Sequence, residues 1–140
     1  AFCSRLCYIG RRIMLKKLWY FKLAVIWSII ITVLCLLPNS NFETTSTYLP
    51  VSFDKIVHVI FFFVLTILLF YGKIKQQESY QYRPFTVVKI ILITSIIGLS
   101  IEFMQRYIFI YRTGDLFDFI ADMLGVTMGI FGYIFLHRAK

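Results

Sequence analysis

Hydrophobic residues along the chain fall into four long runs, separated by short polar segments. The runs extend over residues 19–37, 56–72, 85–101 and 119–136. At a rise of 1.5 Å per residue, the 19 residues of the first run span roughly 28 Å, close to the hydrocarbon thickness of a bilayer. The pattern therefore predicts an all-α fold, an integral membrane bundle of four transmembrane helices.

Polar and small residues share one face of the last predicted helix. They recur three or four positions apart, as Asp115, Asp118, Asp122, Gly125, Gly129 and Gly132. Hydrocarbon would leave the carboxylates unsolvated, so this face is expected to meet other helices or a watered cavity. The glycines would let a neighbouring helix approach closely. The third run has a similar face, formed by Ser95, Gly98, Glu102 and Gln105.

The composition supports a membrane protein of one domain. Hydrophobic residues make up 59% of the 140 and charged residues only 16%, which is too apolar for a soluble domain. The formal net charge is +8, which could indicate nucleic-acid binding. However, the basic residues flank the apolar runs, which is typical of a membrane protein. Cys3, Cys7 and Cys35 form no disulfide framework and no metal-ligand spacing.

The chain divides into a basic cytoplasmic leader, residues 1–18, and a membrane domain, residues 19–140. Met14 followed by LKKLWYF is typical of a translation start, so residues 1–13 are either part of the leader or an upstream extension of the reading frame. A cleaved signal peptide is the alternative for the first run. It is disfavoured because the apolar stretch is long and no small-x-small cleavage site follows it.

Basic residues predict the orientation, because they are retained on the cytoplasmic side of short loops. Twelve lie in the leader through Lys22, in the loop between the second and third runs, and in the tail. Only Lys55, Arg106 and Arg112 lie on the other side. Both termini are therefore predicted to be inside, and six of the seven acidic residues lie at or near the outer surface.

Polar residues at the outer ends of the last three predicted helices form the candidate site. They are Asp54, His58, Glu102, Gln105, Arg106, Arg112, Asp115, Asp118 and Asp122. Asp122 lies about one helical turn inside the bilayer boundary, where an ionisable group is expensive. It is interpreted as a catalytic or ligand-binding carboxylate; an interhelical clamp to Arg112 or His58 is the alternative.

Two residues of the candidate site have more than one possible chemical role. His58 is a candidate general acid or base, or a metal ligand together with two of Asp54, Glu102, Asp118 and Asp122. No close-spaced motif such as H-E-x-x-H supports the metal, so we expect no cofactor, with a divalent cation as the alternative. Arg112 either neutralises the aspartates or holds a phosphate bidentately.

Three motifs together resemble the VanZ-like membrane proteins of bacteria. These are D-K-x-x-H at Asp54, Lys55 and His58; E-x-x-Q at Glu102 and Gln105; and R-x-x-[SD]-x-x-D-x-x-x-N-x-x-G-x-x-x-G from Arg112 to Gly129. The resemblance covers about residues 23–136. Asp122 stands where the motif has Asn, which adds a negative charge, so a role that needs a neutral amide does not carry over.

The resemblance implies an envelope protein of the bacterial cytoplasmic membrane that affects susceptibility to teicoplanin, other glycopeptides or other wall-targeting compounds. One mechanism is an enzyme that acts on a lipid or lipid-linked wall precursor; the other is a non-catalytic binding or scaffold protein. The hypothesis assigns catalysis to His58, Glu102, Asp118 and Asp122, ligand binding to Asp54, Lys55, Gln105, Arg112 and Asp115, and helix packing to Gly98, Gly125, Gly129 and Gly132. The expected partners are the lipid bilayer and such a precursor or a glycopeptide, and the oligomeric state is left open.

Overall fold

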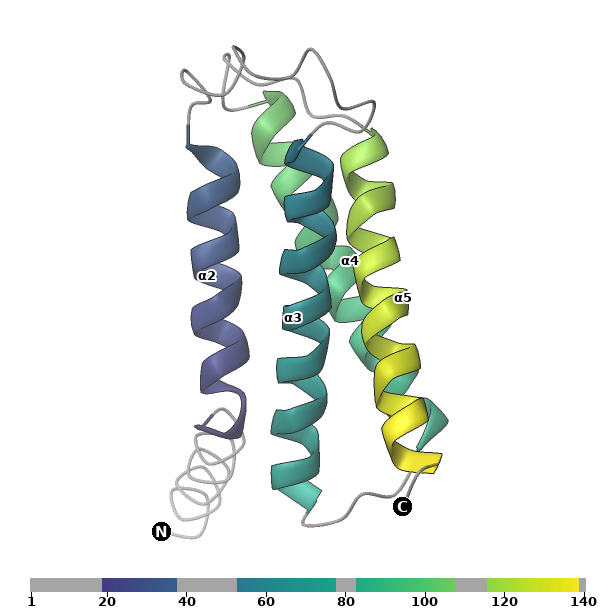
Figure 1. Cartoon of the computed structure of the whole chain (residues 1–140). Coiled ribbons are helices and arrows are strands. Elements are labelled where there is room, and N and C mark those ends of the chain that lie inside the picture. The colour runs from purple at the N-terminus through teal and green to yellow at the C-terminus, as the bar shows by residue number, and fades with distance from the viewer. Residues whose placement is uncertain (1–18, 38–52, 78–82, 108–115, 139–140) are drawn as a thin grey trace, which may run out of the picture.

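The computed structural model of the protein describes residues 19–37, 53–77, 83–107 and 116–138. Within these ranges the chain is all-helical, without strands, which confirms the all-α part of the predicted fold class (Figure 1). The four helices are α2 (Lys22–Leu36), α3 (Phe53–Gln77), α4 (Pro84–Tyr107) and α5 (Leu116–Arg138).

Successive helices run in opposite directions along the bundle (Figure 1). Helix α3 occupies the centre and contacts α2, α4 and α5, and its contact with α5 is the most extensive. The C-terminal ends of α2 and α4 therefore lie beside the N-terminal ends of α3 and α5 (Figure 1). Residues distant in sequence are brought together there.

Proline residues mark two of the helix boundaries. Leu37 follows α2 in an extended conformation, with φ −66° and ψ 138°. It precedes Pro38, whose ring disfavours helical backbone at the preceding residue. Pro84 is the first residue of α4, where its missing N–H removes no intrahelical hydrogen bond. The sequence thus determines one end of each of these helices locally.

Three of the helices are long enough and apolar enough to cross a membrane. The candidate membrane spans are Lys55–Gln77 in α3, Pro84–Tyr107 in α4 and Leu116–Leu136 in α5. Helix α2 is apolar but has only 15 residues, which span roughly 22 Å, less than a typical hydrocarbon core. By length and composition this is the organisation of a multi-pass membrane protein.

Glycines on α5 produce the close approach to α3. A Cβ at Gly125 would collide with the Val59 carbonyl oxygen, and one at Gly129 would lie 2.8 Å from Thr66 Cβ. Both glycines are buried, so helix backbone meets helix surface directly. The sequence also predicts that Gly132 packs against a helix. Nothing in the described part of the chain lies within 4 Å of its Cβ position.

Apolar side chains fill the rest of the interior. Phe62 and Leu65 of α3 and Ile31 of α2 are completely buried. Many large apolar side chains on α2, α4 and α5 point outward, as expected of helices solvated by lipid chains. Some polar side chains are also buried in this interior, among them His58, Gln105 and Asp122.

Candidate functional site

Each of the four helices places at least one buried side chain that can form hydrogen bonds at the same end of the bundle. We call these residues the buried polar cluster: Cys35 of α2, His58 of α3, Gln105 of α4 and Asp122 of α5. All four have a relative exposure of 4% or less. Because Cys35 and Gln105 lie near C-terminal ends and His58 and Asp122 near N-terminal ends, the antiparallel arrangement brings them to one level.

A hydrogen bond between His58 and Asp122 joins α3 to α5. His58 Nδ1 lies 2.8 Å from Asp122 Oδ1, and the two side chains are 1% and 0% exposed. A carboxylate only accepts hydrogen bonds, so the imidazole carries its hydrogen on Nδ1 when Asp122 is ionised. This interaction fixes the orientation of the ring.

The other imidazole nitrogen faces a thiol. Cys35 Sγ lies 3.8 Å from His58 Nε2, within hydrogen-bonding reach for sulfur. With the hydrogen on Nδ1, Nε2 is free to accept a proton from the thiol. The order thiol, imidazole, carboxylate is that of a nucleophile, its base and the group that orients the base. The arrangement can therefore support proton transfer at His58 or nucleophilic chemistry at Cys35.

Gln105 connects α4 to this chain of contacts. Its Nε2 donates a hydrogen bond of 2.8 Å to the backbone carbonyl of Cys35, in the last turn of α2. That carbonyl is among the last four of the helix and has no intrahelical donor, so the glutamine satisfies it. Gln105 Oε1 and Asp122 Oδ2 are also buried, and neither has a donor in the described part of the chain. The cluster can accept further hydrogen bonds.

Gly98 makes room for the Asp122 carboxylate on the α4 side. A Cβ at Gly98 would lie 3.0 Å from Asp122 Oδ2, tighter than ordinary van der Waals contact. The carboxylate is therefore enclosed between His58 of α3 and the backbone of α4. The same Cβ would lie 3.4 Å from the ring of Phe119, so a small residue at position 98 leaves room for two side chains of α5.

An ion pair lies one turn nearer the end of the bundle. Lys55 Nζ is 3.0 Å from Asp118 Oδ1, and the side chains are 29% and 7% exposed. The ammonium also lies 5.5 Å from the ring centroid of Phe117. Lys55 is partly exposed and Asp118 is not, so the pair lies between the buried polar cluster and the end of the bundle.

The remaining predicted residues fall into three groups. Glu102 lies on α4 between Gly98 and Gln105 and is partly buried, while Arg106 is exposed in the last turn of the same helix. Asp54 belongs to the first turn of α3. Arg112 and Asp115, including the proposed clamp between Arg112 and Asp122, lie outside the described residues. Within the described ranges no group of three His, Cys, Asp or Glu residues is arranged to hold a metal ion.

Sequence reasoning missed Cys35. It sits in an apolar run where a cysteine is an ordinary small hydrophobic residue, and no motif includes it. The available signal was its position, because residue 35 is near the end of the first run and His58 is near the start of the second. Antiparallel neighbours place those two positions at the same membrane level.

These features define a multi-pass helical membrane protein with a buried polar cluster at one end of the bundle. The chain matches the VanZ/LLP1 family over residues 11–137 and belongs to that family, which confirms the resemblance read from the motifs. An uncharacterized protein of Schizosaccharomyces pombe is 31% identical over 122 residues, covering 86% of this chain and 72% of the yeast protein. No solved structure matches the chain.

Proposed function

We propose that this VanZ-like protein acts on a lipid or lipid-linked substrate at one membrane surface, with His58 as the acid–base group. The observation that supports it is the His58–Asp122 hydrogen bond of 2.8 Å, which is buried and leaves Nε2 directed at a thiol. Ionisable groups inside a membrane domain are expensive and are seldom retained without a function. A substrate of such a site must lie in or at the membrane.

The proposed topology has four crossings with both termini in the cytoplasm. The distribution of twelve basic residues against three supports this orientation, and the alternating helix directions are compatible with it (Figure 1). The first crossing would use the apolar run of residues 19–37, which is longer than α2 itself. The buried polar cluster then lies on the extracytoplasmic side of the bacterial cytoplasmic membrane.

In a bacterial envelope the proposed activity would change susceptibility to compounds that act on the wall. A lipid-linked wall precursor is one candidate substrate, and teicoplanin and other glycopeptides or lipoglycopeptides are the compounds affected. The relative from fission yeast favours a substrate class common to bacterial and fungal membranes, because the family is not confined to bacteria. Lipids meet this condition, and a precursor of the bacterial wall does not.

The test compares membrane lipids and drug tolerance in a Gram-positive host expressing the wild type, H58Q or D118N. The wild type should yield a changed lipid and greater tolerance to a lipid-tailed glycopeptide than to one without a tail, because the tailed drug concentrates at the membrane. H58Q and D118N should lose both effects at normal protein abundance. K89Q, an exposed change on α4 at the other end of the bundle, is the control. Retention of both effects in H58Q would refute the role of His58.

The second candidate function is a non-catalytic binding or scaffold protein that organises envelope components. The burial of all four cluster residues favours it, because a network with 4% exposure or less can serve as an interhelical clamp. In this case H58Q would lower the folded yield in detergent, while any H58Q protein that reached the membrane would still confer tolerance. The abundance and tolerance measurements therefore separate the two functions.

A further inference from the structure

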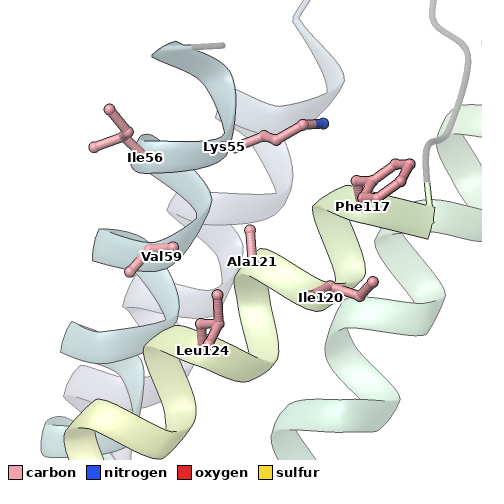
Figure 2. A pocket seen from close by; sticks show the side chains of 7 residues that line it. All are labelled: Lys55, Ile56, Val59, Phe117, Ile120, Ala121 and Leu124. Carbon is pink, nitrogen blue, oxygen red and sulfur yellow. The ribbon is translucent and has the colours of Figure 1, made fainter. Parts of the chain in front are cut away.

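An apolar groove lies between α3 and α5 at the end of the bundle that holds the buried polar cluster (Figure 2). Its volume is about 220 Å³. On α3 it is lined by Lys55, Ile56 and Val59, and on α5 by Phe117, Ile120, Ala121 and Leu124. Apart from Lys55 the lining residues are all apolar.

The shape of the groove follows from small residues on α5. At Gly125 the backbone of α5 touches that of α3, at Val59. About one turn nearer the end of the bundle Ala121 presents only a methyl group, and it is buried at 5% exposure. Ile56 and Ile120 are 43% and 47% exposed. Ala121 thus forms the floor of a groove whose walls are open to the surroundings.

The walls belong to the candidate membrane spans Lys55–Gln77 and Leu116–Leu136, so in a membrane they would face lipid chains. A concave apolar surface within a membrane-spanning segment is solvated by acyl chains, which gain dispersion contacts there. Lys55 lines the groove near the N-terminal end of α3, and its Nζ lies 3.0 Å from Asp118 Oδ1. An acyl chain in the groove would therefore carry its headgroup to this ion pair.

The two charges at the ion pair select the headgroup. Lys55 and Asp118 together have a formal charge of zero, so a purely anionic headgroup that approaches Lys55 also meets the carboxylate of Asp118. A headgroup with both a phosphate and an ammonium complements both charges. A primary ammonium donates hydrogen bonds to a carboxylate, whereas a quaternary one has no N–H to donate.

We propose that the groove binds one acyl chain of a phospholipid whose headgroup carries a phosphate and a primary ammonium, with that headgroup at Lys55 and Asp118. This phospholipid would be the substrate class of the proposed function, and any reaction at the groove rests on that function. Val59 follows His58, and Ala121 precedes Asp122, so the groove and the hydrogen-bonded pair occupy adjacent faces of the same helical turns. The bound lipid would lie beside the candidate acid–base group.

Native mass spectrometry of the full chain in detergent tests the groove directly. The protein is titrated with dioleoyl phosphatidylethanolamine, phosphatidylcholine or phosphatidylglycerol, and retained lipid is counted by mass. Phosphatidylethanolamine should be retained about tenfold more tightly than the other two, the value of one charge-assisted hydrogen bond. A121F, which fills the floor, should abolish this preferred site. D118N should remove the headgroup preference, because no carboxylate is left to accept from the ammonium. K55Q should weaken retention of all three lipids, which share the phosphate, and K55R should keep it.

Two further variants control the experiment. I120A shortens an exposed wall residue and should weaken retention even if A121F gives no folded protein. I93A makes the same change on the exposed face of α4 and should have no effect. Equal retention of the three lipids by the wild type, or unchanged retention by I120A, would contradict the proposal that the groove binds this phospholipid. So would displacement of the lipid by soluble phosphoethanolamine alone, because recognition would then need no acyl chain. These outcomes are independent of H58Q, which tests the proposed function.

Discussion

At the scale of single residues, the enclosed carboxylate of Asp122 determines what the site can do. One oxygen accepts from His58 at 2.8 Å, and the other lies against Gly98 with no donor in the described ranges. A buried, oriented imidazole keeps a fixed tautomer, which is the requirement for directional proton transfer. Cys35 Sγ lies 3.8 Å from His58 Nε2, so its thiol is the group from which the ring can accept a proton.

The residue-scale prediction concerns replacements of Asp122. D122N should keep both the fold and the cellular effect, because an amide oxygen can still accept from His58 Nδ1 and a Cys–His–Asn arrangement retains the geometry. D122A leaves a buried imidazole donor unsatisfied and should lower the free energy of unfolding by about 1–3 kcal/mol. Thermal unfolding in detergent, followed by circular dichroism, measures the difference.

The family motif places Asn at this position, so D122N also tests whether the departure of this chain matters. Equal destabilisation by D122N and D122A would mean that the charge of Asp122, rather than its acceptor oxygen, maintains the contact. The orienting role assigned to the carboxylate would then be wrong.

At the scale of the elements, hydrophobic periodicity predicted the helices better than their ends. The second run, residues 56–72, becomes a helix over Phe53–Gln77, and the third, residues 85–101, becomes one over Pro84–Tyr107. Lysines and glutamines extend a helix beyond the hydrocarbon without breaking it, so hydropathy underestimates helix length. The position of Cys35 indicates that it lies at the level of His58, but only the packing of the helices decides whether the two side chains make contact.

The glycines of α5 give the element-scale prediction. G125L and G129L should each cost about 1–3 kcal/mol in the free energy of unfolding, because the added side chain meets the backbone of α3 or Thr66. G132L is the matched control on the same helix, since the described chain has nothing within 4 Å of that Cβ position. Folded yield in detergent and thermal unfolding report the cost.

An equal loss of stability in all three leucine variants would show that helix propensity, and not contact with α3, explains the effect. No loss in G125L would show that α3 and α5 do not touch there. The apolar groove between α3 and α5 would then not be closed by a contact at Gly125.

At the scale of the whole molecule, the bundle is asymmetric along its axis. At the end with the buried polar cluster, each helix contributes a polar residue, and an ion pair lies next to it. Toward the other end the helices pack through apolar contacts, such as the stacked rings of Phe70 and Tyr133 with centroids 3.9 Å apart. Under the proposed function, the orientation of the bundle in the membrane decides at which leaflet this polar end lies.

The last prediction therefore concerns orientation, which rests on the basic residues of the sequence. Single cysteines at Ser46 and Thr113 should react with a membrane-impermeant thiol reagent in intact cells, and one at Gln77 should react only after the membrane is permeabilised. The background replaces Cys3, Cys7 and Cys35 with serine, so that labelling reports only the introduced thiol. Because Ser46 and Thr113 belong to segments with few basic residues and Gln77 follows Lys73 and Lys75, the positive-inside rule gives this pattern. Labelling at Gln77 in intact cells, with protection at Ser46 and Thr113, would reverse the orientation and assign the buried polar cluster and the groove to the cytoplasmic leaflet.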